Sequence, residues 1–279
     1  MTIKNLLCFL VLLPCSYLSF SQRTEGDTWA KVKAQGSGTL AIYYSEQGGL
    51  IEDINGKPAG LCVEILKDFV EFIKKKYNKK IALQYVGKET VFADFLTTVQ
   101  KSNHLLGVTN VTITEERKKV LKFTPPFISN PVVLLTHKDA PTVNSMVELP
   151  SKLAGFTAEI LGGSTHEKYI NKIKKEGWPN LTVTYGSSEI EIFKKITATS
   201  KIFTILDFTE FVNANRKRIP IKKQNVDLGD PDQLAFVMPK QSDWGEPWKE
   251  FLTDEYRRSP QYRKKVSDHL GMAFLSVLK

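Results

Sequence analysis

The feature that most constrains the fold is an alternation of short β-rich segments with amphipathic helical segments. The stretch AGLCVEILKDFVEFIKKKY, residues 59–77, repeats apolar residues at helical spacing and ends in lysines. It lies between GTLAIYYS, residues 38–45, and KIALQYV, residues 80–86, which are rich in β-forming residues. Strands that alternate with helices are typical of parallel sheets with right-handed crossovers. The chain is therefore predicted to be an α/β protein.

The alternation continues along the chain in two series. The first series continues with a helix at 90–101 and strands at 105–113 and 131–139. The second has strands at 153–160, 181–186 and 201–208 and helices at 165–178 and 187–198, and a strand at 234–240 leads into the C-terminal helices. No Gly/Ser-rich linker separates the two series. We therefore expect two lobes joined by short crossing strands rather than by a flexible tether.

The N-terminus has the three-part layout of a secretory signal. Lys4 is followed by the apolar run LLCFLVLLP and then by small residues, so residues 1–21 are predicted to be removed after Ser21. The apolar run is too short to remain as a membrane anchor. A lipoprotein that keeps Cys15 is the alternative, although Pro14 stands where a small residue is usual. Export of this kind predicts a periplasmic protein.

Composition and motifs exclude several functional classes. The net charge is +9, but lysines and arginines are scattered rather than gathered with aromatic residues, so nucleic acid is not an expected partner. Cys62 would be the one cysteine left in the mature chain and is expected to be buried, which leaves no internal disulfide. The four histidines lie far apart, and no GxSxG, HExxH, P-loop or CxxC motif is present. We expect no enzyme, metal or cofactor.

A binding site is indicated by the segment NVTITEERKKVLKFTPPF, residues 110–127. Thr112 and Thr114 alternate near the end of a β-branched strand, and Arg117 follows. An arginine fork can hold a carboxylate through two parallel hydrogen bonds. From the residues alone, a surface salt bridge to Glu115 or Glu116 is the favoured role.

This segment resembles the TITxxR and V.FS.P stretch of type 2 periplasmic solute-binding proteins of the polar amino-acid class, whose fold is shared with the ligand cores of ionotropic glutamate receptors. Three other segments resemble that family in order: residues 38–70, GGSTHEKYI at 162–170 and KIFTILDFTEF at 201–211. The resemblance covers about residues 37–270. It implies a two-lobed Venus-flytrap fold, with residues 22–130 and 238–279 in lobe 1, residues 131–237 in lobe 2, and hinge segments near 129–133 and 235–239.

The resemblance also implies a set of ligand-binding residues. Arg117 would hold the ligand α-carboxylate, with Asn110 and Thr112 beside it. Ser164 and Thr165 open the helix predicted at 165–178, where backbone N–H groups favour an anion. Plain N-capping is an alternative role for both residues.

The remaining residues of the implied site lie at a strand end and on aromatic positions. Asp207, at the carboxyl end of a strand, would take the ligand ammonium; an N-cap is again the alternative. Phe92 and either Tyr43 or Tyr44 would stack on the ligand side chain, although Phe92 suits a core position equally. The family's aromatic stretch after the first strand is SEQGGLI here, so Glu46 and Gln47 could replace one wall.

The implied function is capture of an amino acid or similar small carboxylate by a monomer that closes around it and delivers it to an ABC transporter permease. One alternative is an enzyme on the same fold, similar to cyclohexadienyl dehydratase, in which a cleft carboxyl acts as general acid. Another is a sensor or a binder of cell-wall fragments. Fold alone does not choose among these functions.

Overall fold

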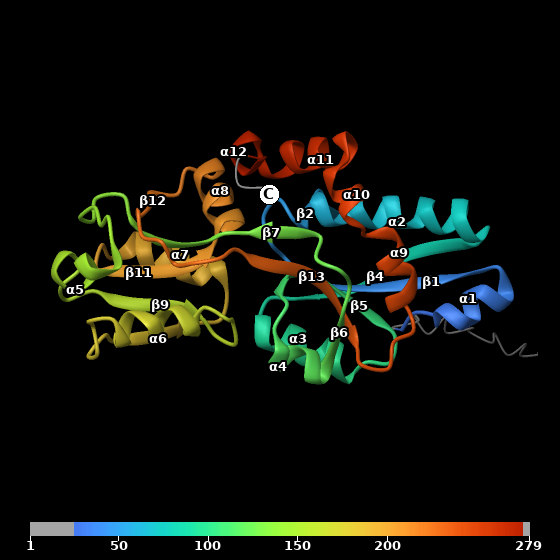
Figure 1. The fold of residues 1–279 in the computed structure, drawn as a ribbon, viewed down its shortest axis with the longest axis horizontal. Coiled ribbons are helices and arrows are strands. Elements are labelled where there is room, and N and C mark those ends of the chain that lie inside the picture. Colours follow the sequence, from blue (N-terminus) through green and yellow to red (C-terminus); the bar gives the residue numbers. More distant parts are fainter. Residues whose placement is uncertain (1–24, 276–279) are drawn as a thin grey trace, which may run out of the picture.

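We describe the protein from a computed structural model, which covers residues 25–275. The predicted signal peptide and Cys15 lie outside the described residues, as do the last four residues. The two-lobed α/β architecture expected from the sequence is confirmed: two separate mixed sheets lie side by side along the long axis of the molecule (Figure 1).

The first sheet has the strand order β4-β1-β5-β13-β6, and β7 also pairs with β13. Its strands are β1 (Ser37–Ser45), β4 (Lys80–Glu89), β5 (Leu105–Thr112), β6 (Leu121–Phe123), β7 (Ile128–Asn130) and β13 (Asp232–Pro239). β4 and β5 run parallel to β1, as the crossover pattern predicts, whereas β13 runs antiparallel to β5.

Helices cover both faces of this sheet. The amphipathic segment predicted at 59–77 forms α2 (Leu61–Tyr77) and packs on the face that carries Leu40 and Ile42 of β1. On the opposite face, α3 (Phe92–Lys101) packs against Val111 and Val237. Cys62, in the first turn of α2, is fully buried, as expected. The smaller elements of this lobe are α1 (Trp29–Gln35), the hairpin β2 (Glu52–Ile54) and β3 (Lys57–Ala59), and α4 (Glu115–Val120).

The second sheet has the order β10-β9-β11-β8-β12. Its strands are β8 (Val132–His137), β9 (Thr157–Leu161), β10 (Val183–Gly186), β11 (Ile202–Asp207) and β12 (Ile221–Lys223). On one face lie η1 (Met146–Glu148), α5 (Leu149–Lys152) and α6 (Glu167–Lys175), and on the other lie α7 (Glu189–Ala198) and α8 (Phe208–Arg216). β8 is antiparallel to β11, so this sheet is also mixed.

The chain crosses between the two sheets at two places. It leaves the first sheet after Asn130 and enters the second at Val132, with Pro131 between them. The return was expected near 235–239, with lobe 2 ending at residue 237, and this is wrong. The whole of β13 from Asp232 belongs to the first sheet, because Asp232 already pairs with Asn130 and Leu234 with Thr112. The return crossing therefore lies between Lys223 and Asp232.

The C-terminal helices connect the two lobes along one side of the molecule (Figure 1). They are α9 (Gly245–Phe251), α10 (Asp254–Arg258), α11 (Pro260–Leu270) and α12 (Met272–Leu275). α11 packs against α2 of lobe 1, and Phe274 of α12 is fully buried beside Phe208 of α8, with 5.8 Å between ring centroids. Within residues 25–275, no helix is both long and apolar enough to cross a membrane.

Candidate functional site

A small polar cavity lies between the two lobes and collects most of the residues that the resemblance implied. Its lining is Phe92, Asn110, Thr112, Arg117, Leu161, Ser164, Thr165, His166, Asp207 and Glu210. The cavity measures about 20 Å³, which is room for about one water molecule. Polar side chains from lobe 1 and from lobe 2 therefore meet here almost in direct contact.

Arg117 reaches this cavity from α4 of lobe 1. Thr114 caps α4, because its side-chain oxygen accepts a hydrogen bond from the backbone N–H of Arg117. The guanidinium donates to the backbone oxygen of Thr112 at 3.0 Å and, across the cleft, to that of Gly163 at 3.0 Å. Its carbon lies 5.4 Å from the ring centroid of Phe92.

The salt-bridge role of Arg117 that the sequence left open is not what the structure shows. Glu115 pairs with Lys118 and Glu116 with Lys119, each at 2.7 Å, and no described carboxylate forms an ion pair with Arg117. Burial lowers the pKa of Arg117 to about 10, against the opposing effect of the charges on Asp232 and Asp207. Arg117 is thus a half-buried cation at neutral pH whose remaining N–H groups are available for an anion.

Asp207 faces Arg117 from the end of β11 in lobe 2. It caps α8 in a capping box with Glu210, whose Oε2 accepts the backbone N–H of Asp207 at 2.8 Å. Its Oδ2 accepts a 2.8 Å hydrogen bond from Asn110 of lobe 1. Its Oδ1 is buried without a hydrogen-bond donor among the described residues, and Nε2 of His166 lies 3.6 Å away. Asp207 thus has both of the roles that the sequence left as alternatives: it caps α8 and it lines the cleft.

Glu210 lines the same cavity and was missed by the sequence analysis. It is 1 % exposed, and its Oε1 accepts from Asn110 at 3.2 Å. Burial, together with the charges of Asp207 and Glu189, raises the pKa of Glu210 well above its usual value. The spacing Asp207-x-x-Glu210 ahead of a helix is a capping-box pattern and could have identified this residue.

Ser164 and Thr165 lie in the turn before α6, not in its first turn. α6 was expected from Thr165 but begins at Glu167, because Gly162 and Gly163 form a turn in which the N–H of Ser164 bonds to the oxygen of Leu161. Gly163 has φ +74°, a conformation that favours glycine. A Cβ placed on Gly163 would lie 3.4 Å from the Cβ of Ala93 in lobe 1. The Ser164 hydroxyl accepts the N–H of His166 at 3.3 Å.

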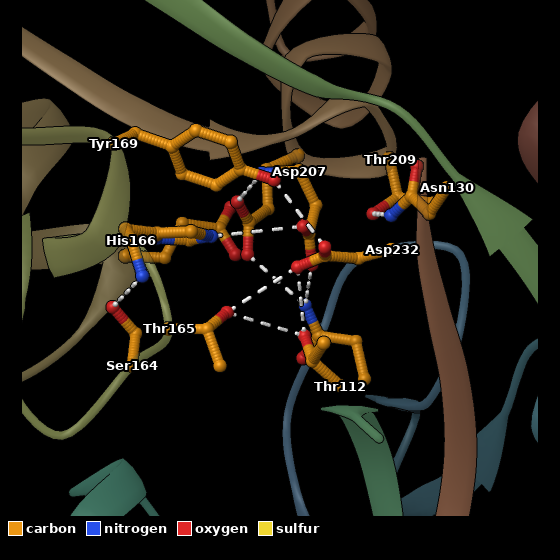
Figure 2. A network of polar contacts seen from close by, with 12 residues as sticks. Thr112, Asn130, Ser164, Thr165, His166, Tyr169, Asp207, Thr209 and Asp232 are labelled. Carbon is orange, nitrogen blue, oxygen red and sulfur yellow. Dashed lines mark hydrogen bonds and ion pairs between the residues drawn. The ribbon is translucent and has the colours of Figure 1, made fainter. Parts of the chain in front are cut away.

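A third buried carboxyl residue, Asp232, joins the lobes beside the cavity (Figure 2). Its Oδ2 accepts from the hydroxyls of Thr112 and Thr165 at 3.2 and 3.3 Å. Its Oδ1 accepts from Lys168 at 2.8 Å and from Tyr169 at 3.3 Å. The hydroxyls of Thr112 and Thr165, expected to meet a ligand directly, are thus held by Asp232. Sequence reasoning missed Asp232 because it lies in the loop-like run GDPDQ with no pattern around it.

The aromatic positions divide between the site and the core. Phe92 lines the cavity, which is one of the two positions expected for it. Tyr43 does not line the cavity: its ring stacks 6.0 Å from Phe95, on the face of β1 under α3. Tyr44 lies in the α2 core, where its hydroxyl donates to Asp53 at 2.6 Å. Alternation along β1 thus places the two tyrosines on opposite faces of the sheet, each in a core, and neither lines the cavity.

Glu46 and Gln47, which could have replaced the family's missing aromatic wall, do not line the cavity. Glu46 pairs with Lys88 at 2.6 Å, away from the cavity. Gln47 instead reaches across to lobe 2 and donates to Oε2 of Glu189 at 2.7 Å. Over the described part of the chain, no three His, Cys, Asp or Glu side chains are placed to hold a metal ion.

Comparison with known proteins identifies the family. Residues 49–270 match the model of bacterial extracellular solute-binding proteins, family 3, so the chain belongs to this family. The resemblance stated from the four sequence segments is therefore confirmed.

A curated relative is the amino-acid-binding protein AabA of Dichelobacter nodosus, which is 25% identical over 126 residues, 45% of each chain. The match thus spans less than half of that relative.

Solved structures share the fold at low identity. An ancestral arginine-binding protein bound to glutamine superposes with a TM-score of 0.66 at 18% identity, over 84% of this chain and 98% of that one. An ancestral amino acid-binding protein, a precursor of cyclohexadienyl dehydratase, superposes with a TM-score of 0.67 at 17% identity, over 86% and 98%. At these identities the structures support the two-lobed fold alone. Family and relatives are binding proteins.

Proposed function

We propose that the protein captures an amino acid, or a similar small carboxylate, between its two lobes. This proposal rests on one observation: two side chains of opposite charge, Arg117 and Asp207, line the same cavity. The Arg117 guanidinium has no carboxylate partner among the described residues, and Oδ1 of Asp207 is a buried acceptor without a donor. A ligand α-carboxylate at Arg117 and an α-ammonium at Asp207 would satisfy both groups.

In this proposal the other lining residues have supporting roles. Asn110 and Ser164 supply polar contacts, and Phe92 supplies an apolar wall. Asp232 positions the hydroxyls of Thr112 and Thr165 rather than meeting the ligand. The lobes would part about the crossings at Pro131 and between Lys223 and Asp232, and would close on the ligand.

The test is a thermal-shift titration of the purified protein with the twenty amino acids and several dicarboxylates. Native mass spectrometry beforehand checks for ligand carried through purification. We expect one or a few zwitterions to raise Tm by several degrees, because ligand at 100 times its Kd adds about 2.7 kcal/mol of stability. The Arg117→Ala variant should fold and lose this shift. Absence of any shift with wild-type protein would remove the amino-acid proposal.

We further propose that the captured solute is delivered to an ABC importer by a periplasmic, monomeric protein. Support comes from the predicted signal at residues 1–21 and from the family description as extracellular solute-binding proteins. The closed form would be the one the permease recognises, by population shift. Cell fractionation with and without residues 1–21 tests the location, and globomycin-sensitive processing would indicate the lipoprotein alternative at Cys15.

A second candidate function, an elimination catalysed in the cleft, is favoured by one observation. Glu210 lines the cavity with a raised pKa, so its protonated carboxyl could donate a proton to a leaving hydroxyl. The fold is shared with a precursor of cyclohexadienyl dehydratase. Turnover of prephenate by wild-type protein, abolished in Glu210→Gln, would support it; binding without turnover would leave capture as the function.

A further inference from the structure

The charged side chains at the cleft balance one another in two pairs, and this balance bears on which ligand fits. The first pair lines the cavity: Arg117 supplies one positive charge and Asp207 one negative charge. Two other titratable residues line the cavity. Burial, together with the charge of Asp207, raises the pKa of Glu210 well above its usual value and so favours its neutral form. The second is His166, whose Nε2 lies 3.6 Å from Oδ1 of Asp207.

The second pair is Asp232 and Lys168, which lie on opposite lobes. Their atoms Oδ1 and Nζ are 2.8 Å apart, and Asp232 is 6 % exposed. This pair is joined to the cavity through Thr112 and Thr165, which line it and donate to Asp232. The same carboxylate also acts on Arg117. Burial lowers the pKa of Arg117, and the charge of Asp232 is the largest opposing effect, which raises that pKa. Any change in the Asp232–Lys168 pair therefore changes the charge that a ligand meets.

The rest of the lining is uncharged. It consists of Phe92, Asn110, Thr112, Leu161, Ser164 and Thr165. Among residues 25–275, no further charged side chain lines this cavity to pair with a third charge. A zwitterion with an uncharged side chain brings one charge of each sign and leaves the closed cleft neutral. A ligand with a charged side chain would bury one unpaired charge, which is strongly unfavourable.

We propose that this cleft selects an amino acid whose side chain is uncharged, and that the Asp232–Lys168 pair sets this selection. This inference rests on the proposed function, because it takes Arg117 and Asp207 as the partners of the ligand backbone. It commits to a ligand class that differs from arginine, lysine, aspartate and glutamate.

The experiment compares ligands of matched shape and different charge. Calorimetry at pH 8, where an ordinary histidine is neutral, measures the binding of matched pairs. The pairs are glutamine and glutamate, asparagine and aspartate, citrulline and arginine, and norleucine and lysine. In each pair for which binding is detected, we expect the uncharged member to bind at least about tenfold more tightly. A charged member that binds best would overturn this inference while leaving the proposed function intact. Absence of binding by every amino acid would remove the proposed function itself.

Two variants test the role of the pair. Lys168→Met removes the positive charge of a half-exposed side chain and should shift the citrulline-to-arginine affinity ratio at least about threefold toward arginine. Asp232→Asn keeps an acceptor for the threonine hydroxyls and should shift the glutamine-to-glutamate ratio toward glutamate by a similar factor. Lys172→Met, an exposed lysine of the same helix, is the control and should leave both ratios unchanged.

The outcomes of the variants are decisive in either direction. Opposite shifts in Lys168→Met and Asp232→Asn would establish the pair as the determinant of charge selection. Unchanged ratios in both variants, with melting curves that show folded protein, would overturn the role assigned to the pair. Ratios that move equally in Lys172→Met would assign the effect to the general charge of the lobe surface instead.

Discussion

At the scale of single residues, the site is defined by groups whose partners lie far away in the sequence. Arg117 sits among four charged neighbours that pair with one another along α4 and leave it directed to the cavity. Asp207 and Glu210 are neighbours on one helix turn, yet both share the Asn110 amide from the other lobe. Two adjacent buried carboxyls cannot both ionise cheaply, and Glu210 is the one held protonated.

The state of Glu210 predicts a pH-dependent stability. The unfolded chain releases this proton near pH 4.5, whereas the folded chain releases it at higher pH. Between these two values the folded state binds more protons, so the free energy of unfolding falls as pH rises. Glu210→Gln removes the titrating proton and keeps one of the two acceptor oxygens. It should therefore gain stability relative to wild type between pH 4 and pH 7.5, by about 1 kcal/mol or more, or about 2–4 °C in Tm per kcal/mol.

Thermal unfolding of both proteins from pH 4 to pH 8 checks this prediction. The gain in Tm should vanish near pH 4, where wild-type Glu210 is protonated in both states. Glu71→Gln, on the exposed side of α2, is the matched control and should show no such pH-dependent gain. A gain from Glu210→Gln that is equal at pH 4 and pH 7.5 would contradict the assigned protonation state.

At the scale of elements, α8 packs closely against the loop that follows β1, and this contact depends on Gly48 in that loop. A Cβ placed on Gly48 would lie 1.9 Å from Nδ2 of Asn213, which is 7 % exposed on α8. Gly48→Ala should therefore force Asn213 aside and destabilise the protein by about 1–3 kcal/mol, as overpacking does. Urea unfolding measures the change.

A double-mutant cycle separates this clash from a backbone effect. Asn213→Ala removes the obstructing amide, so Gly48→Ala should cost clearly less in that background, with a coupling of about 1 kcal/mol or more. Equal costs in both backgrounds would show that the loop is not pressed against α8 in solution.

Much of the element scale could be predicted from the sequence, because helical and strand periodicities are local. The pattern of residues 59–77 gives α2 directly, and the alternation gives the parallel β4-β1-β5 core. The return crossing was misplaced because β13 is a continuous apolar run, and periodicity does not tell which sheet it joins. Asp232 was missed for a related reason: its donors come from positions 112, 165, 168 and 169, which only the folded chain brings together.

At the scale of the whole molecule, direct contacts hold the two lobes together around a cavity of about 20 Å³. Pockets that bind small molecules measure about 300–1,000 Å³, so entry of an amino acid requires the lobes to separate. One contact that resists separation lies away from the cavity lining. Gln47 of lobe 1 donates to Glu189 of lobe 2 at 2.7 Å, and burial raises the pKa of Glu189 to about 7.

Weakening this contact should therefore shift the molecule toward the open form without touching Arg117 or Asp207. Gln47→Ala removes the amide that donates to Glu189 from the other lobe, so closure becomes less favourable. We expect a larger radius of gyration in small-angle scattering and a faster association of ligand in stopped-flow measurements, because a larger fraction of molecules is competent to bind. The difference from wild type should be greater at pH 8 than at pH 5. Above a pKa of about 7 the Glu189 carboxyl is ionised, and a charged carboxylate is less stable in this position without the Gln47 donor. Gln100→Ala, on the exposed side of α3, should change neither quantity. If Gln47→Ala leaves both the radius and the association rate at wild-type values, separation of the lobes is not what limits entry, and the cavity must be reached by a route that leaves the Gln47–Glu189 contact intact.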